Sequence, residues 1–598
     1  MIKLILSIIL VLFASAFLLA QDDEFYDAVV YLEGVNSIEE LDEDIISDYY
    51  RYYRNKLRLN TCSENALKKS GLFTTYRIAA LKDYMDRNGL IYSFNELIIV
   101  DGYNACYVEA LKPFISLNFN EDYDESPYVD NGVFLGLKYN KDYSYRFKYN
   151  LDYKNRFGLN LGMKTTYDKA KEPYYSASLV YSGKEWLNNL IVGDYYLNLG
   201  QGLILWTGFS LSGLSSSMIK TKYGISPYRS YYNENAHRGV AVDVDLKKFH
   251  FGTSFSVLAL DELMCGVKDE KLGLMMCAFS RYNYRNGHLG FQLYLSELSL
   301  GEKSINEKPL DGKLSFDARW AYRGVELFGE LAYDFISSVP AGIIGARYDF
   351  STLSFRVYPA NYVSKYAAAL RSSTKTSNEY ALAWTNNFTF GPWVELRGKT
   401  GIGSSVIKNR INTSLDLALF PEPKSSDKED GKNNSKYLKF IFNYYSQLSE
   451  IVEFRLKLSE RCRTYNPYNR SEIQSKLIFT NNVWNLNSQI NAVYSDDLAI
   501  LFYLEGGYKF KGFSSYLRSG IFKADDWDDR IYVYERDAPG SFNVPAYYGR
   551  GLWFALVFSY RFTDIIKLYL RSSYKTYSLM EERKPSKLEL SFFISWEF

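Results

Sequence analysis

The last eleven residues of the chain carry a pattern that few folds accommodate. From Leu588 to Phe598 every second residue is apolar, and four of the five residues between them are polar. A period of two gives a β-strand one apolar face and one mostly polar face. The apolar set is Leu588, Leu590, Phe592, Ile594, Trp596 and Phe598, and the set between them is Glu589, Ser591, Phe593, Ser595 and Glu597. The segment is therefore predicted to be a strand with one face toward an apolar environment and the other toward an aqueous one.

Runs of the same kind fill the chain from about residue 133 to its end. In Tyr143–Tyr153, aromatic and aliphatic side chains alternate with Ser, Arg, Lys, Asn and Asp. We count about 22 to 26 such runs, most of them near the ~9–11 residues that a tilted strand needs to cross a bilayer. Further examples are Val133–Asn140, Arg238–Leu246, His250–Leu260, Leu314–Tyr322, Ile451–Ser459, Leu501–Phe510 and Ile565–Lys575. The pattern predicts an all-β transmembrane barrel of antiparallel strands, which are even in number in bacterial single chains.

The aromatic content favours this reading over a secreted β-sandwich or a propeller array. The chain holds 55 Tyr and 39 Phe, and aromatic residues make up 17% of it. Membrane barrels place such side chains in girdles at the two membrane interfaces. The register of Tyr143–Tyr153 predicts that Arg146, Lys148 and Asp152 point into the lumen and that Tyr145, Phe147 and Tyr149 point toward lipid.

The two ends of the chain predict export to the outer membrane. Met1–Ala20 has an early Lys3 followed by an apolar run, with a plausible cleavage point after Ala20. This is typical of a removed signal peptide rather than of a membrane anchor. Outer-membrane barrel proteins end on strands similar to Leu588–Phe598, and the terminal Phe resembles the signal that the barrel-assembly machinery reads. We expect the Gram-negative outer membrane as the location, with its lipid and this machinery as partners.

Two segments are too long to be hairpin turns. Pro421–Lys436 has low complexity and is typical of a solvated external loop. Ser212–Arg238 follows a glycine-rich stretch at Gly193–Gly202, and glycines in strands mark bends or close backbone approach. We expect this second segment to fold against the wall or into the interior, because long structureless loops are usually functional or disordered. Its charged residues Arg229, Glu234 and Arg238 would then form a polar cluster in the lumen.

Residues 21–118 are predicted to form a small all-α domain, joined to the barrel at 133–598 by a linker at 119–132. Sequences typical of capping boxes occur at Ser37–Glu40, Thr61–Glu64 and Ser93–Glu96. The second and the third each open a short helix, which a glycine-containing turn and a further helix follow. Gly71 and Gly102 lie in the two turns. The domain therefore consists of two similar helical units in tandem.

This tandem arrangement resembles the helix-hairpin-helix repeat, and most closely the ComEA-type domain of competence DNA receptors. The similarity covers about residues 57–115 and begins at Leu59–Cys62. The whole chain also resembles a family of Gram-negative outer-membrane proteins that carry this domain before a large barrel. The motifs that suggest it are Gly193–Tyr195, Gly200–Leu203, Pro227–Ser230 with Glu234, Asn235, Arg238 and Gly239, and Phe542–Pro545 with Gly549–Gly551. The resemblance implies a periplasmic helical domain and DNA binding, and it transfers no established activity.

The chemistry of the helical domain offers arguments for and against DNA. Helix-hairpin-helix units point turn amides and a helix N-terminus at phosphates, and residues 51–88 carry nine basic and three acidic residues. The residues expected to shape the turns or contact phosphates are Lys68, Lys69, Gly71, Leu72, Arg77, Lys82 and Gly102. Against DNA, each turn has one glycine instead of the usual two, and Asp101 would repel a phosphate. Residues 22–48 also hold eleven Asp or Glu and no Lys or Arg.

The preferred interpretation is a non-enzymatic barrel whose helical domain binds a polymer, first of all DNA, at the pore. The alternative is an envelope scaffold or transport protein whose helical domain docks another protein or plugs the barrel. A barrel-embedded hydrolase is a remote alternative, because the histidines His237, His250 and His288 belong to no catalytic or zinc motif. We expect no cofactor and no metal. Cys62 and Cys106 could form a disulfide within the helical domain.

Overall fold

The computed structural model describes most of the chain outside its N-terminus and several loops. The described ranges are 23–41, 43–117, 129–153, 156–165, 173–183, 186–207, 218–231, 236–258, 273–299, 311–348, 350–364, 366–390, 395–397, 404–406, 409–449, 451–467, 469–481, 483–510, 512–538, 541–563, 565–577 and 585–598. The predicted signal peptide at 1–20 and most of the predicted linker at 119–132 lie outside these ranges. The first barrel strand begins at Val129, slightly before the predicted start at 133.

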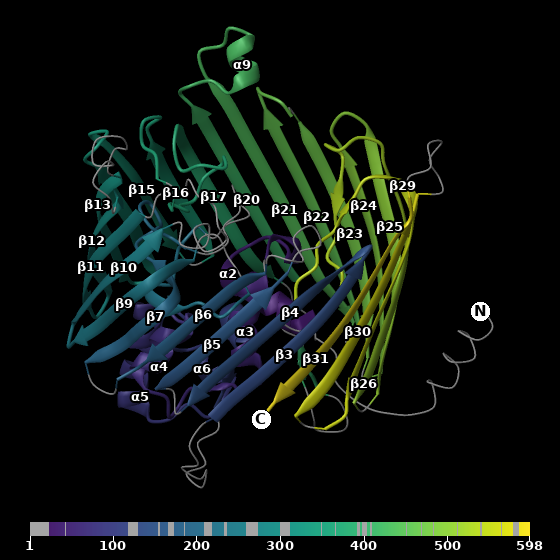
Figure 1. The fold of residues 1–598 in the computed structure, drawn as a ribbon, viewed down its shortest axis with the longest axis horizontal. Coiled ribbons are helices and arrows are strands. Elements are labelled where there is room, and N and C mark those ends of the chain that lie inside the picture. Colours follow the sequence, from purple (N-terminus) through teal and green to yellow (C-terminus); the bar gives the residue numbers. More distant parts are fainter. Residues whose placement is uncertain are drawn as a thin grey trace.

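Twenty-four antiparallel strands form the wall of a closed barrel, within the predicted range (Figure 1). The first twelve are β3 Val129–Asn140, β4 Asp142–Tyr153, β5 Phe157–Lys164, β6 Tyr174–Tyr181, β7 Leu187–Asn198, β9 His237–Leu246, β10 Phe249–Leu258, β11 Gly273–Tyr284, β12 Gly287–Ser299, β13 Asp311–Tyr322, β14 Val325–Asp334 and β15 Val339–Tyr348. The other twelve are β16 Ser351–Tyr358, β17 Glu379–Phe390, β20 Asn409–Phe420, β21 Ser435–Ser449, β22 Val452–Arg463, β23 Arg470–Thr480, β24 Trp484–Tyr494, β25 Leu498–Phe510, β26 Phe513–Ala524, β29 Gly549–Arg561, β30 Ile566–Thr576 and β31 Lys587–Glu597.

The barrel closes between its first and last strands, where β3 pairs with β31. On β31 the side chains of Phe592 and Trp596 lie on the outer face, 39% and 47% exposed. Ser591 and Ser595 are buried toward the lumen. The alternation predicted from the sequence of this strand is therefore confirmed.

Phe593 is the one apolar residue on the inward face of β31, and it has a specific place there. A Cβ atom added at Gly136 of β3 would lie 2.6 Å from Cε1 of Phe593, closer than such atoms ever approach. The glycine therefore leaves room for the ring at the closing seam. Close approach of this kind is a usual reason for a glycine inside a strand.

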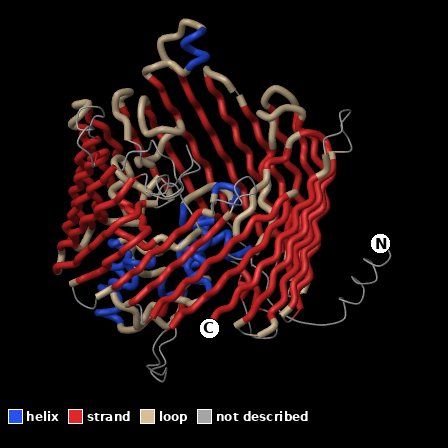
Figure 2. The backbone as a smooth tube through the Cα atoms, viewed as in Figure 1, coloured by secondary structure: helices blue, strands red, loops and turns tan. Residues whose placement is uncertain are grey.

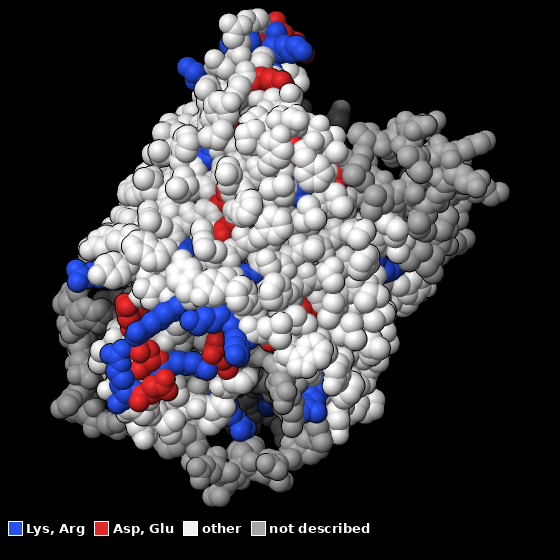
Figure 3. Space-filling view, turned by 90° about the vertical axis from the view of Figure 1, so that its left-hand side faces the viewer, with Lys and Arg blue, Asp and Glu red and all other residues white. Residues whose placement is uncertain are grey.

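Large apolar side chains cover the outer face of the wall, as the alternation predicts. On β24, Trp484, Leu486 and Ile490 are about half exposed, while the residues between them point inward. Figure 3 shows one side of the barrel as a largely uncharged surface, with Lys, Arg, Asp and Glu gathered toward its two ends. Among the described residues, no helix is long and apolar enough to cross a membrane.

The N-terminal helices lie inside the barrel, in the half nearer the C-terminus (Figures 1 and 2). They are α2 Asp23–Glu33, the 3-10 helix η1 Ile38–Glu40, α3 Glu43–Arg54, α4 Glu64–Ser70, α5 Thr75–Asn88, α6 Phe94–Leu97 and α7 Ala105–Leu111, with the two-residue strands β1 Leu57–Arg58 and β2 Ile115–Ser116. We call residues 23–117 the plug. The predicted helices are present, but the prediction of a helical body separate from the barrel is corrected, because the plug packs against the lumen wall.

Other chain segments also enter the lumen. Strand β7 turns inward after Gly193, and its continuation pairs with the short strand β8 at Gly224–Pro227. Leu197, Leu203 and Leu205 on this continuation are fully buried, with Tyr362 from the connection between β16 and β17. The described part of the predicted interior segment, 218–231, thus packs inside the barrel. The lumen behind β6 to β17 has an apolar core of its own.

The remaining short elements lie in the connections between strands. They are the helix α9 at Ser425–Glu429 and the strand pairs β18 Glu395–Arg397 with β19 Ser404–Val406 and β27 Ile531–Tyr532 with β28 Ala546–Tyr547. The segment predicted as an external loop, Pro421–Lys436, contains α9 and projects from the end of the barrel opposite the plug (Figure 1). Helix α9 is held by Asp427, whose carboxylate accepts a hydrogen bond from Lys432 at 2.7 Å.

Candidate functional site

The plug is built from short helices with well-defined starts. Each of four helices begins with a side-chain cap, which accepts a hydrogen bond from the backbone N–H three residues later in the chain. The caps are Ser63 for α4, Thr74 for α5, Ser93 for α6 and Asn104 for α7. The cap of α4 is thus Ser63 and not Thr61 as the sequence suggested. Ser37 makes no side-chain cap, because only a 3-10 turn follows it.

The plug has its own hydrophobic core, which allows it to behave as one body. Leu81, Leu97, Leu111 and Phe114 are fully buried in it. Full burial of each such side chain contributes roughly 1.5–3 kcal/mol to folding. The core is also continuous with Tyr534, Phe542 and Val544, which belong to the connection between β26 and β29.

Ion pairs and hydrogen bonds join the plug to strand β4. Arg146 pairs with Glu43 at 2.8 Å, and Lys148 donates to Ser47 Oγ at 2.6 Å. Asp152, further along β4, pairs with Arg51 at 2.7 Å. The predicted inward direction of these three β4 residues is confirmed, and Tyr145, the residue before Arg146, is 48% exposed on the outside.

A second set of contacts lies across the lumen, on β20 and β22. The guanidinium of Arg455 donates to the carboxylate of Asp27, with Nη1 2.7 Å from Oδ1. Lys457 donates to Ser37 Oγ at 3.3 Å, and Ser414 lies 3.4 Å from the amide oxygen of Asn36. The acidic stretch at 22–48 therefore finds partners in the barrel wall and not only within its own domain.

The connection between β26 and β29 forms a third contact with the plug. We call its described residues 531–538 and 541–547 the strap. Tyr534 of the strap packs on Tyr26 of α2, with ring centroids 5.1 Å apart. The peptide N–H of Tyr534 donates to Glu39 of the plug at 3.4 Å. The sequence motif Phe542–Pro545 thus contributes to the contact between plug and wall.

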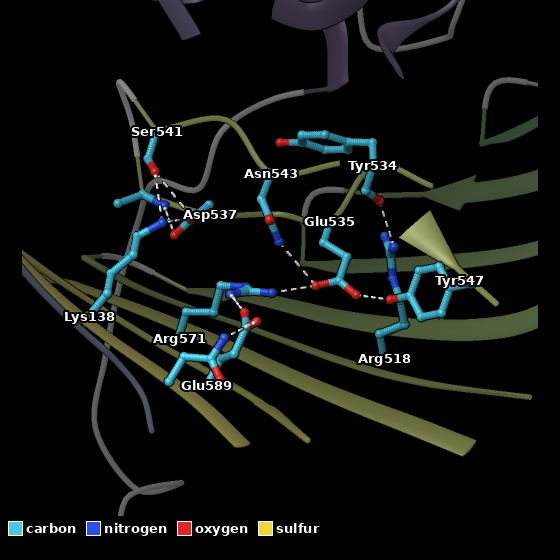
Figure 4. Close-up of polar contacts among 12 residues, drawn as sticks. Lys138, Arg518, Tyr534, Glu535, Asp537, Ser541, Asn543, Tyr547, Arg571 and Glu589 are labelled. Atoms are coloured by element: carbon cyan, nitrogen blue, oxygen red, sulfur yellow. Dashed lines mark hydrogen bonds and ion pairs between the residues drawn. The ribbon is translucent and has the colours of Figure 1, made fainter. Parts of the chain in front are cut away.

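Buried ion pairs fix the strap to the lumen wall (Figure 4). Asp537 pairs with Lys138 of β3 at 3.1 Å. Arg518 of β26 pairs with Glu505 of β25 at 2.6 Å and donates to the carbonyl oxygen of Tyr534 at 2.6 Å. Glu535 accepts short hydrogen bonds from Arg571 and from the Tyr547 hydroxyl. Removing one partner of such a buried pair typically costs about 3–5 kcal/mol, because the other charge stays buried.

The predicted phosphate-contacting residues have partners within the plug. Lys68 and Lys82 both pair with Glu64, at 3.0 Å and 2.8 Å. Burial alone would raise the pKa of the Glu64 carboxyl, but the hydrogen bonds from Lys82 and Lys68 lower this pKa below its ordinary value. Arg77 lies over the ring of Tyr107, 3.6 Å from its centroid, and donates to the carbonyl oxygen of Gly102 at 2.9 Å. The side chain of Lys69 lies outside the described part of the molecule.

Neighbouring side chains lie close to the glycines of the two predicted turns, although Gly102 itself stays exposed. Gly71 and Gly102 both have positive φ, +68° and +79°, as turn glycines do. A Cβ at Gly71 would lie 3.7 Å from Lys222 Cγ, and one at Gly102 would lie 3.0 Å from the ring of Tyr76. Leu72 is buried, and its carbonyl oxygen accepts from the Tyr107 hydroxyl at 2.5 Å. Asp101, next to Gly102 in the second turn, accepts a short hydrogen bond from the Tyr76 hydroxyl.

The structure places the residues of the predicted lumen cluster in different surroundings. Arg238 of β9 pairs with Asp194 of β7 at 2.7 Å. Arg229 lies near the plug, where burial and Arg51 lower the pKa of its guanidinium. Glu234 lies outside the described residues. Asp194, which the sequence analysis named only as part of the Gly193–Tyr195 motif, is therefore the ion-pair partner of Arg238.

The predicted disulfide of the helical domain is not formed. Cys62 remains a thiol, and its Sγ donates to the carbonyl oxygen of Leu59 at 3.6 Å. Burial raises the pKa of this thiol to about 11. Within the described part of the chain, no group of three or more His, Cys, Asp or Glu residues is arranged to hold a metal ion.

A polar cavity of about 90 Å³ lies between the plug and strands β21 to β26. From the plug, Tyr26, Asp27 and Ser37 line it. From the wall come Arg455, Lys457, Gln474, Lys476, Asn487, Gln489 and Glu505. Asn485, Asn487, Gln489 and Asn491 follow one another on the inward face of β24 and are almost fully buried. This side of the lumen is therefore polar, in contrast to the apolar side behind β6 to β17.

Comparisons with known proteins identify no family for the chain. No family model matches it, and no curated protein matches it. Among solved structures, the translocation pore of the P pilus usher PapC is similar at 10% identity and a TM-score of 0.36, over 78% of this chain and 99% of that one. An E. coli P pilus tip assembly intermediate that contains PapC gives 10% identity and a TM-score of 0.44, over 80% and 61%. A mutant Rh. blastica porin gives 10% and 0.23, over 54% and 100%. These are β-barrel similarities too distant to carry an argument about function.

Proposed function

We propose that this protein is an outer-membrane barrel that is closed by its own plug and opens for transport when the plug is displaced. Barrels of 16–18 strands leave an aqueous channel, and larger ones need a plug to be closed. The wall here has 24 strands, and the helices occupy its interior. The apolar outer face supports a membrane location, and we propose the outer membrane as that membrane.

One observation carries this proposal: the charges of plug and wall are matched at two separate places. Asp27 and Glu43 of the plug pair with Arg455 of β22 and Arg146 of β4. Side-chain pairs of this kind can be broken and remade without unfolding either partner. The core of the plug also comes almost entirely from its own residues, with Tyr534, Phe542 and Val544 of the strap as the outside contributors, so that the plug can leave as one body. A plug held in this way is suited to reversible release.

Conductance across a planar bilayer tests this function. Asp27→Asn with Glu43→Gln removes one charge at each place, and the pore is expected to open more often than in the unmodified protein. Asp525→Asn is the matched control, because Asp525 pairs with Arg550 outside the plug contact. Unchanged opening in the double variant would contradict a plug held by these pairs.

A cross-link provides the complementary measurement. Asn36 and Ser414 are short side chains that lie 3.4 Å apart across the plug boundary. In a chain whose own cysteines are replaced by Ala, Asn36→Cys with Ser414→Cys should close the pore under oxidation, and a reductant should restore opening. If the oxidised protein conducts as often as the reduced one, plug displacement is not the opening step.

DNA remains a second candidate as the polymer that the released plug binds. The observation that favours it is that Gly71 and Gly102, each between two successive short helices, have the positive φ that a helix-hairpin-helix turn would need. In the closed state Lys222, which lies outside the plug, is next to the Gly71 turn. We therefore propose that Lys68, Arg77 and Lys82 reach phosphates only after release. Released plug that binds no DNA would favour the docking of another envelope protein instead.

A further inference from the structure

The wall has a weak seam between β6 and β7. Only four residue pairs join these strands, Ser178–Tyr181 with Leu190–Gly193. The other neighbouring wall strands are joined by at least seven pairs among the described residues. The number of ladder hydrogen bonds sets how firmly two strands are held, so this seam is the weakest in the described wall.

The seam is short because β7 separates from β6 after Gly193, although it stays paired with β9 through Tyr195. This residue has φ +106°, and a Cβ atom there would lie 2.1 Å from the carbonyl oxygen of Ala177. Only glycine permits both the turn and the close approach to β6. Beyond Tyr195 the chain continues into the lumen beside β8, and residues 174–177 of β6 have no partner in β7.

A side-chain ion pair takes the place of the missing ladder. Asp194 Oδ2 accepts from the N–H of Ala177 at 2.7 Å, and Asp194 Oδ1 accepts from Arg238 at 2.7 Å. Arg238 also donates to the carbonyl oxygen of Tyr175 at 2.9 Å. Two main-chain groups of β6 are thus satisfied by side chains and not by a neighbouring strand. We call Asp194 and Arg238 the latch.

The inner side of the seam is covered by residues 224–231. Ser176 and Ser178 of β6 donate to the carbonyl oxygens of Ser230 and Tyr228, at 2.8 Å and 3.0 Å. The cover is itself part of the apolar core of the lumen, which includes Ile225 of the cover and Ile191 and Leu197 of β7. A path through the seam would therefore join the bilayer to an apolar region inside the barrel.

The cover is connected to the plug. Lys222, two residues before the cover, lies 3.8 Å from Glu33 and 3.6 Å from Asp48. These carboxylates leave with the plug. Displacement of the plug would therefore remove these two charge contacts of Lys222, which hold the cover in place over the seam.

We infer that the seam between β6 and β7 is a lateral portal through which an amphiphile with a hydrocarbon chain passes between lumen and bilayer. This inference rests on the proposed plug displacement. Plug release loosens the cover, the hydrogen bonds from the latch to Ala177 and Tyr175 of β6 then break, and the four-pair ladder opens. A hydrocarbon chain suits this route because Val180 and Ile191 on the inner face of the seam and Ile225 of the cover belong to the apolar core of the lumen, whereas a polar solute would use the polar side of the lumen near β24. In lipid, the main-chain groups of an open edge need partners, so the portal closes again behind the substrate.

Lipid photolabelling of the full chain in nanodiscs tests the portal. The probe is a phosphatidylcholine with a photoreactive acyl chain, and the readout is adducts on the cover, residues 224–231. Asp194→Asn and, separately, Arg238→Gln weaken the latch and are expected to increase these adducts several-fold over the unmodified protein. Adducts on the outer face of β24 serve as the internal reference for labelling and folding.

A cross-linked seam completes the design. Leu179 and Val192 are ladder partners whose side chains are 55% and 47% exposed to the outside. Joining Leu179→Cys to Val192→Cys by a short thiol-reactive bridge should abolish the adducts gained in Asp194→Asn. As a control, the same bridge is placed between Phe355→Cys and Leu382→Cys, which are ladder partners in β16 and β17. It should leave the number of lipid adducts on the cover unchanged.

Adducts that do not rise in either latch variant, or that persist when the seam is bridged, would overturn the portal. If the conductance responses of the plug variants are nevertheless as expected, the proposed plugged barrel survives and only the lateral route is lost. If those responses fail as well, both proposals fail.

Discussion

Asp27 in the first helix of the plug and Arg455 in β22 are joined by two hydrogen bonds across the lumen, although 428 positions separate them in the sequence. The Arg455 side chain is mostly buried, and it also pairs with Glu453 on its own strand. The N-terminal segment and the later part of the wall are thus parts of one folded unit. The plug can be placed only after the distant strand exists to receive it.

Substitution of this pair should loosen the plug more than the barrel. We expect a double-mutant cycle of Asp27→Asn and Arg455→Gln to give a coupling of about 1–2 kcal/mol, since the pair is charged and half exposed. Amide hydrogen exchange of α2 measures it, and the amides of β24 serve as the reference. A coupling near zero would mean that the pair contributes nothing to holding the plug.

Cys62 should report on unfolding of the plug through its reactivity. Its pKa of about 11 in the folded plug lies above the ordinary thiol value of 9.0, mainly because of burial. The thiolate is the reactive form, so that at pH 8 unfolding of the plug should raise the rate of maleimide labelling about a hundredfold. The measurement needs a chain in which Cys62 is the only cysteine. Equal rates with and without urea would show that Cys62 is not protected.

The strap should depend on Glu535. Its partner Arg571 is almost fully buried and keeps only a 3.4 Å contact with Glu589 when Glu535 is removed. Glu535→Ala is therefore expected to destabilise the barrel by about 2–4 kcal/mol. Asp525→Ala, which breaks an exposed pair with Arg550, should cost no more than about 1 kcal/mol. The thermal midpoint of the gel-mobility shift of the folded barrel compares them, and equal midpoints would contradict the role of the strap.

Barrel closure should be sensitive to a methyl group at Gly136. Gly136→Ala places a Cβ against the Phe593 ring and should cost about 1–3 kcal/mol through overpacking. Gly506→Ala is the control, because the nearest atom to its added Cβ is at 3.6 Å. Phe593→Leu should restore part of the loss. If Gly136→Ala is as stable as the control, the Phe593 ring is not confined between β3 and β31.

Local alternation predicted the wall well because lipid imposes it on every strand. Each strand of a barrel faces lipid on one side, so the period of two is repeated along the chain and needs no knowledge of distant residues. The outward row of β31 and the inward Arg146 and Lys148 of β4 were predictable for this reason. The capping serines of the plug were readable because their partners are only three residues away, even though the first residue of α4 was misplaced.

The location of the plug depends on contacts that no local pattern contains. The acidic segment 22–48 was interpretable either as a repellent for DNA or as a partner for nearby basic residues. Its actual partners, Arg146 and Arg455, lie more than one hundred residues away. The inward basic rows of β4 and β22 were a usable signal, since a basic lumen and an acidic N-terminal domain are complementary. The latch was hidden for the same reason, because Asp194 and Arg238 meet only when β7 and β9 pair.

The DNA proposal makes a prediction that depends on the state of the plug. Binding through phosphate contacts requires log K to fall linearly with log salt, with a slope of roughly −0.9 per contact. Lys68→Ala with Lys82→Ala should flatten this slope by up to about two units in the plug-released Asp27→Asn/Glu43→Gln protein. The Asn36→Cys/Ser414→Cys protein should bind duplex DNA only after reduction, because the oxidised plug keeps Lys222 against the Gly71 turn. Titration of labelled duplex DNA at several salt concentrations measures both effects. Binding that is unaffected by the cross-link would place the DNA contact elsewhere, and no binding at low salt in the released protein would remove DNA as the polymer.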